Sequence, residues 1–386
     1  MNKSESKQNQ KFTGFFLCYY ETTRQCNLQC PYCMARVDPA KIAGKKELST
    51  DEIKHLVIDE IYKYTPNGAI AFSGGETLMR PDAMEIIKYN AKKGLWTFIN
   101  TNGKLLTEET LKKLKKITDN HIMFVLPFNS TENDVHEWSR NDDLKTVVNA
   151  GTNCEKLGME YFYLLTISRS NLDTLSPTMK YLKLKQLPML RAPFVPRGAG
   201  NGHRELMFTR EDMAKIIHPI LRENYLSYIS YTPFFASPEA IERKWQELGI
   251  TIGQLGCQAG KGFIGISAEG MVTPCVQMLD NDAVSCGNVR DLSLSKIITG
   301  NQLLNDLRDR KKLEGKCGRC RYKHTCGGCR ALAFYKTGNI FAEDDTCHFD
   351  PIDETTRSEY EEESTRNFEK FLEFLKYNEP WNMIFG

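Results

Sequence analysis

Cys26-Asn-Leu-Gln-Cys30-Pro-Tyr-Cys33 is the most informative stretch of this 386-residue sequence, because its three cysteines are separated by three residues and then by two. Three thiolates on so short a loop can hold three irons of a cubic four-iron cluster, and no fourth cysteine is near enough to close it. The fourth iron would then keep an open coordination position, which generally marks a reactive metal. A zinc site completed by a distant His or Cys is the alternative, since thiolate sites accept both metals.

Segments on both sides of this loop alternate between two patterns. Six short runs are typical of parallel strands: 14–20, 69–73, 97–100, 121–128, 161–167 and 189–194. Helix-length segments separate them: 49–64, 80–93, 107–117, 143–157 and 172–184. Such alternation predicts an α/β fold of β–α units around a parallel sheet. The cysteine loop would follow the first strand, on the side where parallel barrels usually bind ligands.

The overall composition limits the classes of function. With 41% hydrophobic and 26% charged residues the chain is typical of a globular protein, and its net charge of +2 with no long basic run argues against a nucleic-acid partner. No apolar stretch reaches the roughly 18 residues of a membrane helix, and residues 1–11 are too polar for a secretory signal. We therefore expect a cytoplasmic protein whose thirteen cysteines serve mainly as metal ligands rather than as disulfides.

A second motif follows the second predicted strand. In Ser73-Gly74-Gly75-Glu76 the glycines would let the backbone approach a ligand, and the carboxylate could accept hydrogen bonds from an ammonium group. Alone, the motif is equally consistent with an ordinary strand-to-helix turn. Beside the three cysteines it becomes specific.

The two motifs together resemble the radical S-adenosylmethionine (radical SAM) superfamily, whose members carry the Cys-x3-Cys-x2-Cys pattern of Cys26, Cys30 and Cys33. The resemblance covers about residues 13–196. It implies a partial (β/α)6 barrel in which a four-iron cluster binds the amino and carboxylate groups of S-adenosylmethionine at its open iron.

The same resemblance implies which residues lie around S-adenosylmethionine. Tyr32 would lie near the adenine, and Gly74, Gly75 and Glu76 around the methionine amine. Asn100, which begins Asn-Thr-Asn-Gly, is also similar to the family. Many relatives end the fourth strand in Ser-x-Asp-Gly, whereas this chain has Pro127-Phe128-Asn129-Ser130, so Asn129 is the residue expected to bond a ribose hydroxyl.

Eight further cysteines occupy the last third of the chain: Cys257, Cys275, Cys286, Cys317, Cys320, Cys326, Cys329 and Cys347. A zinc ribbon is a poor match, because only five residues separate the two Cys-x2-Cys pairs where a ribbon has about fifteen. The pattern resembles the SPASM extension of many radical SAM enzymes, which binds two auxiliary iron–sulfur clusters.

The SPASM resemblance implies how these cysteines divide. Cys257, Cys275 and Cys329 would serve the first auxiliary cluster, and Cys317, Cys320, Cys326 and Cys347 the second. Cys286 is expected to complete the first set, the alternative being an iron left open to substrate. With the barrel cluster this makes three clusters. Cys18 and Cys154 are interpreted as small buried hydrophobic residues.

The predicted organisation has five parts: a polar tail (1–12), the barrel (13–200), a helical connector (201–256), the SPASM domain (257–350) and a helical C-terminal tail (351–386). The short elements after residue 257 suggest a segment that depends on metal clusters as cross-links.

The resemblance predicts a radical SAM oxidoreductase: a 5′-deoxyadenosyl radical abstracts hydrogen from a substrate carbon, and the auxiliary clusters take up an electron in a net oxidation. SPASM relatives mostly modify peptide or protein side chains, so a peptide substrate is expected. An electron donor such as ferredoxin or flavodoxin is implied. A separate peptide-recognition protein would also be needed, because only about 25 residues precede Cys26.

Two other functions remain open. Oxidative decarboxylation of tetrapyrrole propionates in haem maturation is suggested by the stretch around Arg191 and Arg197, and by Arg204, which could bind carboxylates. A non-catalytic iron–sulfur electron carrier is the alternative from another class. Sulfatase-maturing relatives place an acidic base after the cysteine matched by Cys275, but this chain has Val276, so no general base is assigned. His203 and His348 are weak candidates for proton transfer.

Overall fold

The fold is taken from a computed structural model that describes residues 16–66, 68–185, 187, 189–222, 227–228, 256–349 and 366. The six predicted strands are confirmed as β1 (Leu17–Thr23), β2 (Ala69–Gly74), β3 (Trp96–Asn100), β4 (Ile122–Pro127), β5 (Glu160–Ile167) and β6 (Met189–Pro193). They pair in parallel in the order of the sequence. Consecutive parallel pairing of this kind is the core of a partial β/α barrel.

Four additional strands extend this sheet at its two ends: β7 (Ser227–Tyr228), β8 (Phe263–Ile266), β9 (Met271–Thr273) and β10 (Gly287–Asn288). The order within the described residues is β10-β9-β8-β1-β2-β3-β4-β5-β6-β7. β8 pairs in parallel with β1, placing Phe263 beside Leu17 and Ile266 beside Tyr20. β9 and β10 continue from it as an antiparallel hairpin edge.

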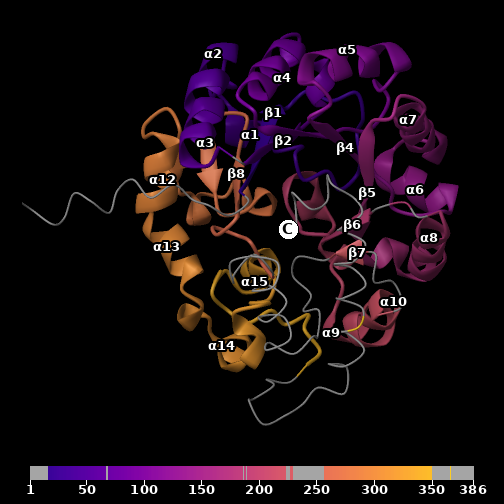
Figure 1. The fold of residues 1–386 in the computed structure, drawn as a ribbon. Coiled ribbons are helices and arrows are strands. Elements are labelled where there is room, and N and C mark those ends of the chain that lie inside the picture. Colours follow the sequence, from indigo (N-terminus) through magenta and orange to yellow (C-terminus); the bar gives the residue numbers. More distant parts are fainter. Residues whose placement is uncertain are drawn as a thin grey trace, which may run out of the picture.

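Helices cover the outer face of the sheet (Figure 1). The barrel region contributes α1 (Pro39–Ile42), α2 (Thr50–Glu52), α3 (Asp59–Tyr64), α4 (Ala83–Lys92), α5 (Glu108–Thr118), α6 (Asn133–Arg140), α7 (Leu144–Lys156), α8 (Leu172–Leu184), α9 (Arg210–Asp212) and α10 (His218–Arg222). The cysteine-rich region contributes α12 (Leu294–Gly300), α13 (Gln302–Arg308), α14 (Gly315–Arg319) and α15 (Arg330–Thr337). The five helices predicted between the strands are all present, and α1 and α6 are additional.

The start of the first long helix follows the sequence signal. Ser49 and Glu52 form a reciprocal cap: the Ser49 hydroxyl accepts from the Glu52 N–H, and the Glu52 carboxylate accepts from the Ser49 N–H. A π-helical segment, Ile53–Ile58, then joins α2 to α3. The predicted helix 80–93 begins later, at Ala83, because Thr77–Met79 first makes a short 3-10 turn.

The cysteine-rich region shares the core of the barrel. Ile264, Val272, Leu294 and Leu304 are buried in the same apolar cluster as Phe16 and Ile70. Its strands and helices bury a continuous apolar surface against β1 and α3, so this region has a source of cohesion besides metal cross-links, and its dependence on those cross-links stays a prediction. Apart from residue 366, which is helical, the predicted C-terminal helix lies outside the described residues. No helix in the described part of the chain is long and apolar enough to cross a bilayer.

Candidate functional site

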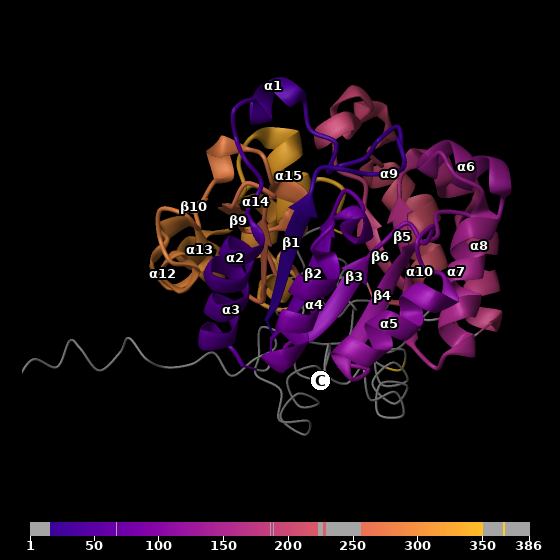
Figure 2. The same cartoon turned by 90° about the horizontal axis from the view of Figure 1, so that it is seen from above.

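The loop with the first three cysteines leaves the carboxyl end of β1. Figure 2 shows α1, which follows this loop, on the side to which β1 points. Cys30 is buried, Cys33 is half-buried and Cys26 is exposed. The exposure of the three thiols in this loop therefore increases from Cys30, which is buried, to Cys26, which is exposed.

The three thiols lie close enough to act on one another electrostatically. Burial raises the pKa of Cys26, and the neighbouring Cys30 and Cys33 raise it further. Burial likewise raises the pKa of Cys33, with Cys30 contributing in the same direction. Holding such thiols as thiolates requires a cation or a metal beside them.

Arg140, at the end of α6, supplies a cation at this position. Burial opposes its charge, but Cys30, Tyr32, Cys33 and Cys26 raise the pKa of its guanidinium. Its Nε is buried with no hydrogen-bond partner among the described residues. Its backbone carbonyl accepts from the Cys30 thiol at 3.1 Å. An unused buried donor beside three thiols fits a site for an anionic group.

The donor set fits an iron–sulfur cluster better than a hard cation, because thiolates are soft ligands. Within the described ranges no three His, Cys, Asp or Glu side chains gather as ligands of a single metal ion. The residues at the end of β1 fit the cluster in ligand type and in their spacing along the sequence.

The glycine motif after β2 is packed directly against the cysteine loop. Gly75 N–H donates to Thr23 O and Glu76 N–H donates to Gln25 O, both at 2.8 Å. A Cβ on Gly75 would lie 1.9 Å from Gln25 O, and Gly74 has φ +106°. Both glycines are required by this close approach of two backbones.

Glu76 connects this turn to the loop after β3. Its side chain is fully buried. Its carboxylate accepts from the Thr101 hydroxyl and the Asn102 N–H, each at 2.9 Å, and from the Leu78 N–H at 3.2 Å. Burial raises the pKa of this carboxyl group, whereas these hydrogen bonds oppose the shift.

The Asn-Thr-Asn-Gly stretch reaches the cysteine loop through Asn102 rather than through Asn100. Asn100 ends β3 and is half-buried. The Asn102 amide donates to Asn27 Oδ1 at 2.7 Å and lies 4.0 Å from Cys26 Sγ. The motif was visible in the sequence, but the residue that contacts the loop was not.

Tyr32 and Asn129 are brought together, although 97 residues separate them. The Asn129 amide donates to the Tyr32 hydroxyl at 3.1 Å and to Ser139 Oγ at 2.9 Å. Asn129 Oδ1 accepts from the Thr166 N–H at 3.2 Å. The structure therefore links the third-cysteine turn to the ends of β4 and β5.

Aromatic rings surround Tyr32. Phe194 meets it edge-to-face with ring centroids 5.4 Å apart, and Trp138 on α6 lies at 5.8 Å. His136, on the same helix, is buried. Burial lowers the pKa of His136 to about 4, and its Nδ1 accepts from the Asn129 N–H at 3.4 Å. The surroundings of Tyr32 are thus largely aromatic, and the imidazole of His136, which contacts Asn129, is neutral.

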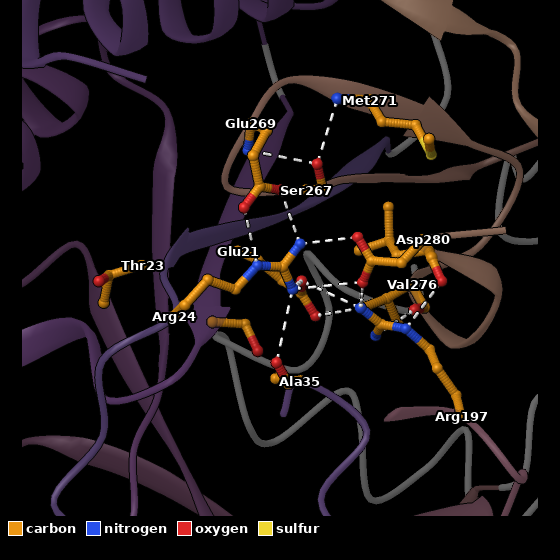
Figure 3. Close-up of polar contacts among 12 residues, drawn as sticks. Glu21, Thr23, Arg24, Ala35, Arg197, Ser267, Glu269, Met271, Val276 and Asp280 are labelled. Atoms are coloured by element: carbon orange, nitrogen blue, oxygen red, sulfur yellow. Dashed lines mark hydrogen bonds and ion pairs between the residues drawn. The ribbon is translucent and has the colours of Figure 1, made fainter. Parts of the chain in front are cut away.

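A buried ion network joins the cysteine loop to the C-terminal region (Figure 3). Arg24 donates to Glu21 at 2.6 Å, to Glu269 at 2.7 and 3.0 Å, and to Asp280 at 2.7 and 3.2 Å. Arg197 donates to both Glu21 oxygens, at 2.9 and 3.0 Å, and to Asp280 at 2.6 Å. Two guanidiniums thereby hold three carboxylates between β1 and β9.

Arg197 also donates hydrogen bonds to the turn after Cys275. Its Nε donates to Leu279 O and its Nη1 to Val276 O, each at 2.9 Å. Its side chain is 3% exposed. The expectation that Arg197 binds a substrate carboxylate therefore needs correction, because its donors are committed inside the protein. Arg204 is exposed and donates weakly to Tyr335 O, whereas Arg191 is buried on β6.

The structure brings seven of the later cysteines into two groups. In the first, Cys257 and Cys275 both raise the pKa of Cys329, after the larger effect of burial. In the second, Cys347, Cys317 and Cys320 act in the same way on Cys326, again after burial. The membership of these groups agrees with the two sets that the sequence resemblance implies, and the role of the cysteines as cluster ligands stays a prediction.

The other predicted residues are not members of these two groups. Burial raises the pKa of Cys286 to about 12, Arg308 is the charged group acting on it, and its Sγ lies 3.8 Å from Val284 O. Cys18 and Cys154 are buried in the apolar core, as expected. His203 pairs with Glu205, whereas His348 directly follows Cys347 of the second group and its ring packs against Phe349 beside His218.

Comparison with known proteins follows the same division of the chain. The family model of the Radical SAM superfamily matches residues 20–182, and that of an iron–sulfur cluster-binding domain, SPASM, matches residues 257–321. An AdoMet-dependent heme synthase of Methanosarcina barkeri is 30% identical over 87% of this chain and 97% of its own length. The chain belongs to the radical SAM superfamily and to its SPASM subgroup.

One further relative agrees with that assignment, and a solved structure shows the same fold. A PqqA peptide cyclase of Rhodopseudomonas palustris is 25% identical over 91% of this chain and 92% of its own. The solved structure of anSMEcpe with bound AdoMet and the Cp18Cys peptide has a TM-score of 0.64 at 18% identity, covering 96% of this chain and 99% of that one. The protein is therefore a radical SAM/SPASM enzyme, with S-adenosylmethionine and iron–sulfur clusters as its cofactors.

Proposed function

We propose that this radical SAM/SPASM enzyme is an oxidoreductase that removes hydrogen from a carbon of a peptide or protein side chain and passes the remaining electron to its cysteine-rich region. The observation that carries the proposal is the Arg24 contact with Glu269 and Asp280, which packs the first cysteine loop against the Cys275 turn. A net oxidation needs such an electron acceptor close to the site where the substrate radical forms.

The cofactor set we propose is one cluster at the end of β1 and two in the cysteine-rich region. The first is held by Cys26, Cys30 and Cys33, and the others by Cys257, Cys275 and Cys329 and by Cys317, Cys320, Cys326 and Cys347. Cys286 remains the sequence-based candidate for a further ligand. When bound, the first cluster and S-adenosylmethionine supply the 5′-deoxyadenosyl radical that abstracts hydrogen.

The chain's own residues position and protect this chemistry. We propose that the methionine end of S-adenosylmethionine binds against the backbone of Gly74, Gly75 and Glu76, beside Asn100. The nucleoside end of S-adenosylmethionine would lie against Tyr32 and Asn129. The buried ring of Phe194 packs against Tyr32 and limits the access of competing hydrogen donors, which would quench a radical. Arg140 offsets the negative charge of the thiolates.

A peptide substrate is supported by the PqqA peptide cyclase relatives and by the solved SPASM structures that share this fold and hold peptides. It is also compatible with Arg197 being engaged internally. An electron donor of the ferredoxin or flavodoxin type, and a separate peptide-recognition protein, complete the proposal.

Tetrapyrrole chemistry is the second candidate, favoured by the heme synthase at 30% identity over nearly its whole length. Because Arg197 is engaged inside the protein, Arg191 and Arg204 remain of the three arginines that we predicted to bind the carboxylates of such a substrate. Arg191 lies on β6, and Arg204 begins a 3-10 turn 11 residues after the end of that strand.

One experiment separates the two substrates. The anaerobically reconstituted protein, with S-adenosylmethionine and dithionite, is incubated with candidate peptides and, separately, with iron-coproporphyrin. A peptide product lighter by two hydrogens supports the proposal, whereas loss of carbon dioxide from the porphyrin supports the second candidate. A Cys30→Ala variant is the matched control and should yield neither product.

A further inference from the structure

Two arginines are buried inside the cysteine-rich region, away from the Arg24 network. Arg310 follows α13 and is 3% exposed, and Arg330 begins α15 and is fully buried. A guanidinium keeps its charge in any protein interior, so each must find anionic or polar partners there.

Arg310 has only part of its hydrogen-bonding capacity satisfied. Its Nη2 donates to Cys257 O at 2.5 Å, whereas its Nε and Nη1 are buried and have no partner within the described ranges. Cys257, from the first group of cysteines, and Cys317 and Cys326, from the second, all act on it electrostatically. Arg310 therefore lies between the two groups with two free donors.

Arg330 faces the second group. Its Nη1 donates to Ile340 O at 3.0 Å and to Ala342 O at 2.6 Å, which fixes the guanidinium in place. Its Nη2 lies 3.8 Å from Cys317 Sγ, and its Nε is buried without a partner in the described part of the chain. The charged end of the side chain is thus directed at a thiol and not at a carboxylate.

The two glycines of Cys326-Gly-Gly-Cys329 make room for both guanidiniums. Gly327 and Gly328 have φ +75° and +63°. A Cβ on Gly327 would lie 2.7 Å from Arg310 Nη1, and a Cβ on Gly328 would lie 2.7 Å from Arg330 Nη2 and 3.0 Å from Cys317 Sγ. Any larger residue in this turn would push the guanidiniums away from the cysteines.

Buried donors without partners are costly, so their retention indicates an acceptor that occupies the site in the loaded protein. Thiolates and the sulfides of an iron–sulfur cluster are anionic acceptors, and hydrogen bonds and nearby charge tune the reduction potential of such clusters. Reduction adds one electron and so increases the negative charge. A fixed cation beside the cluster therefore favours its reduced form.

We propose that Arg310 and Arg330 raise the reduction potentials of the auxiliary clusters, Arg310 acting on both cysteine groups and Arg330 mainly on the group that contains Cys317. This inference rests on the proposed assignment of clusters to these cysteines. It makes the cysteine-rich region a better acceptor for the electron that a substrate radical gives up.

The test uses full-length protein in which Cys26, Cys30 and Cys33 are replaced by alanine, so that only auxiliary clusters are observed. Arg310→Gln and Arg330→Gln are compared with this parent after iron and sulfide analysis, and dithionite titrations are followed by electron paramagnetic resonance. Arg319→Gln is the matched control, because Arg319 is exposed and lies between Cys317 and Cys320.

Arg310→Gln should shift the reduction equilibrium of both signals toward the oxidised form by at least about tenfold, or about 59 mV for one electron. Arg330→Gln should shift one of the two signals in the same direction. Arg319→Gln should shift neither signal by more than about threefold. Fully loaded variants with parental potentials would overturn the inference. If Arg310→Gln takes up less iron, Arg310→Lys is measured in its place. A reduction equilibrium within about threefold of the parent's supports the inference. A shift of about tenfold toward the oxidised form overturns it.

Failure of this inference can be told apart from failure of the proposed function. Formation of 5′-deoxyadenosine is measured on the enzyme with all its cysteines and does not depend on the auxiliary potentials. A cysteine-rich region that binds no iron would overturn the cluster assignment and this inference together, whereas normal loading with unchanged potentials overturns this inference alone.

Discussion

The Arg24 guanidinium holds the carboxylate of Asp280 through two contacts, at 2.7 and 3.2 Å, although 256 residues separate them. Arg24 lies two residues before Cys26, and Asp280 lies five residues after Cys275. Both side chains are about nine-tenths buried. The two ends of the proposed electron path are therefore fixed to each other by charge as well as by the β1–β8 pairing.

Removing one partner of this buried contact should be strongly destabilising. We expect Arg24→Ala to lower the free energy of unfolding by about 3–5 kcal/mol, because three carboxylates would lose a cation in a low-dielectric interior. Denaturant unfolding of the anaerobically purified protein measures the change. Lys113→Ala, which breaks the exposed pair with Glu109, is the control and should change stability by less than about 0.5 kcal/mol. Equal effects of the two variants would contradict the structural role of the network.

The Gly75 contact predicts a selective loss of activity. Gly75→Ala would place a methyl group 1.9 Å from Gln25 O, so the cysteine loop or the turn after β2 must move. We expect S-adenosylmethionine binding to weaken by more than about tenfold, since a displacement of about 1 Å at a positioned site has effects of this size. Equilibrium dialysis measures it. Gly202→Ala is the matched control, because nothing lies within 4 Å of its Cβ position.

His136 predicts a pH dependence of stability. Its pKa in the fold is about 4, below the ordinary value of 6.5, because burial disfavours the charged ring. The neutral ring therefore contributes stability that is fully present above pH 6.5 and is lost as pH falls toward 4. We expect His136→Asn to flatten the decline in unfolding free energy between pH 7 and 5.5 by up to about 1.4 kcal/mol per pH unit.

The control for this titration is His121→Asn, since His121 is exposed. It should leave the pH profile unchanged. A wild-type profile that stays level from pH 7 to 5.5, or an identical slope in His136→Asn, would show that the imidazole does not control this dependence.

The strands of the barrel could be predicted because each is a short apolar run between turn signals. β8 was not recognised as part of the same sheet, since its pairing with β1 joins residues about 245 positions apart and leaves no local pattern. Helix α6 was missed because its eight residues, Asn133–Arg140, carry only a narrow buried face. Arg140, which acts on all three cysteines of the first loop, was missed with it.

The cysteine positions were readable because metal ligands must be cysteines at fixed spacings. The arginines were not, because a sequence does not show which guanidiniums are buried. Arg197 was interpreted as a substrate ligand and instead holds Glu21 and Asp280, whereas Arg310 and Arg330 gave no signal beyond the unusual Gly327-Gly328 pair. Burial and long-range charge pairing depend on the completed fold.

The Cys30→Ala variant tests the ligand assignment. We expect it to lose the iron and sulfide of one cluster and all cleavage of S-adenosylmethionine, while the auxiliary clusters remain, because its thiolate is one of three on a loop with no replacement nearby. Iron and acid-labile sulfide analysis after anaerobic reconstitution measures this. Cys18→Ala, in the apolar core, should keep the full iron content of the wild-type protein.

The most direct measurement of the central claim is the formation of 5′-deoxyadenosine. Anaerobically reconstituted protein is reduced with dithionite in the presence of S-adenosylmethionine, and the nucleoside is quantified together with bound iron and zinc. We predict 5′-deoxyadenosine from the wild-type protein and none from Cys30→Ala. Stoichiometric zinc in place of iron, or an iron-loaded protein that leaves S-adenosylmethionine intact, would contradict the account.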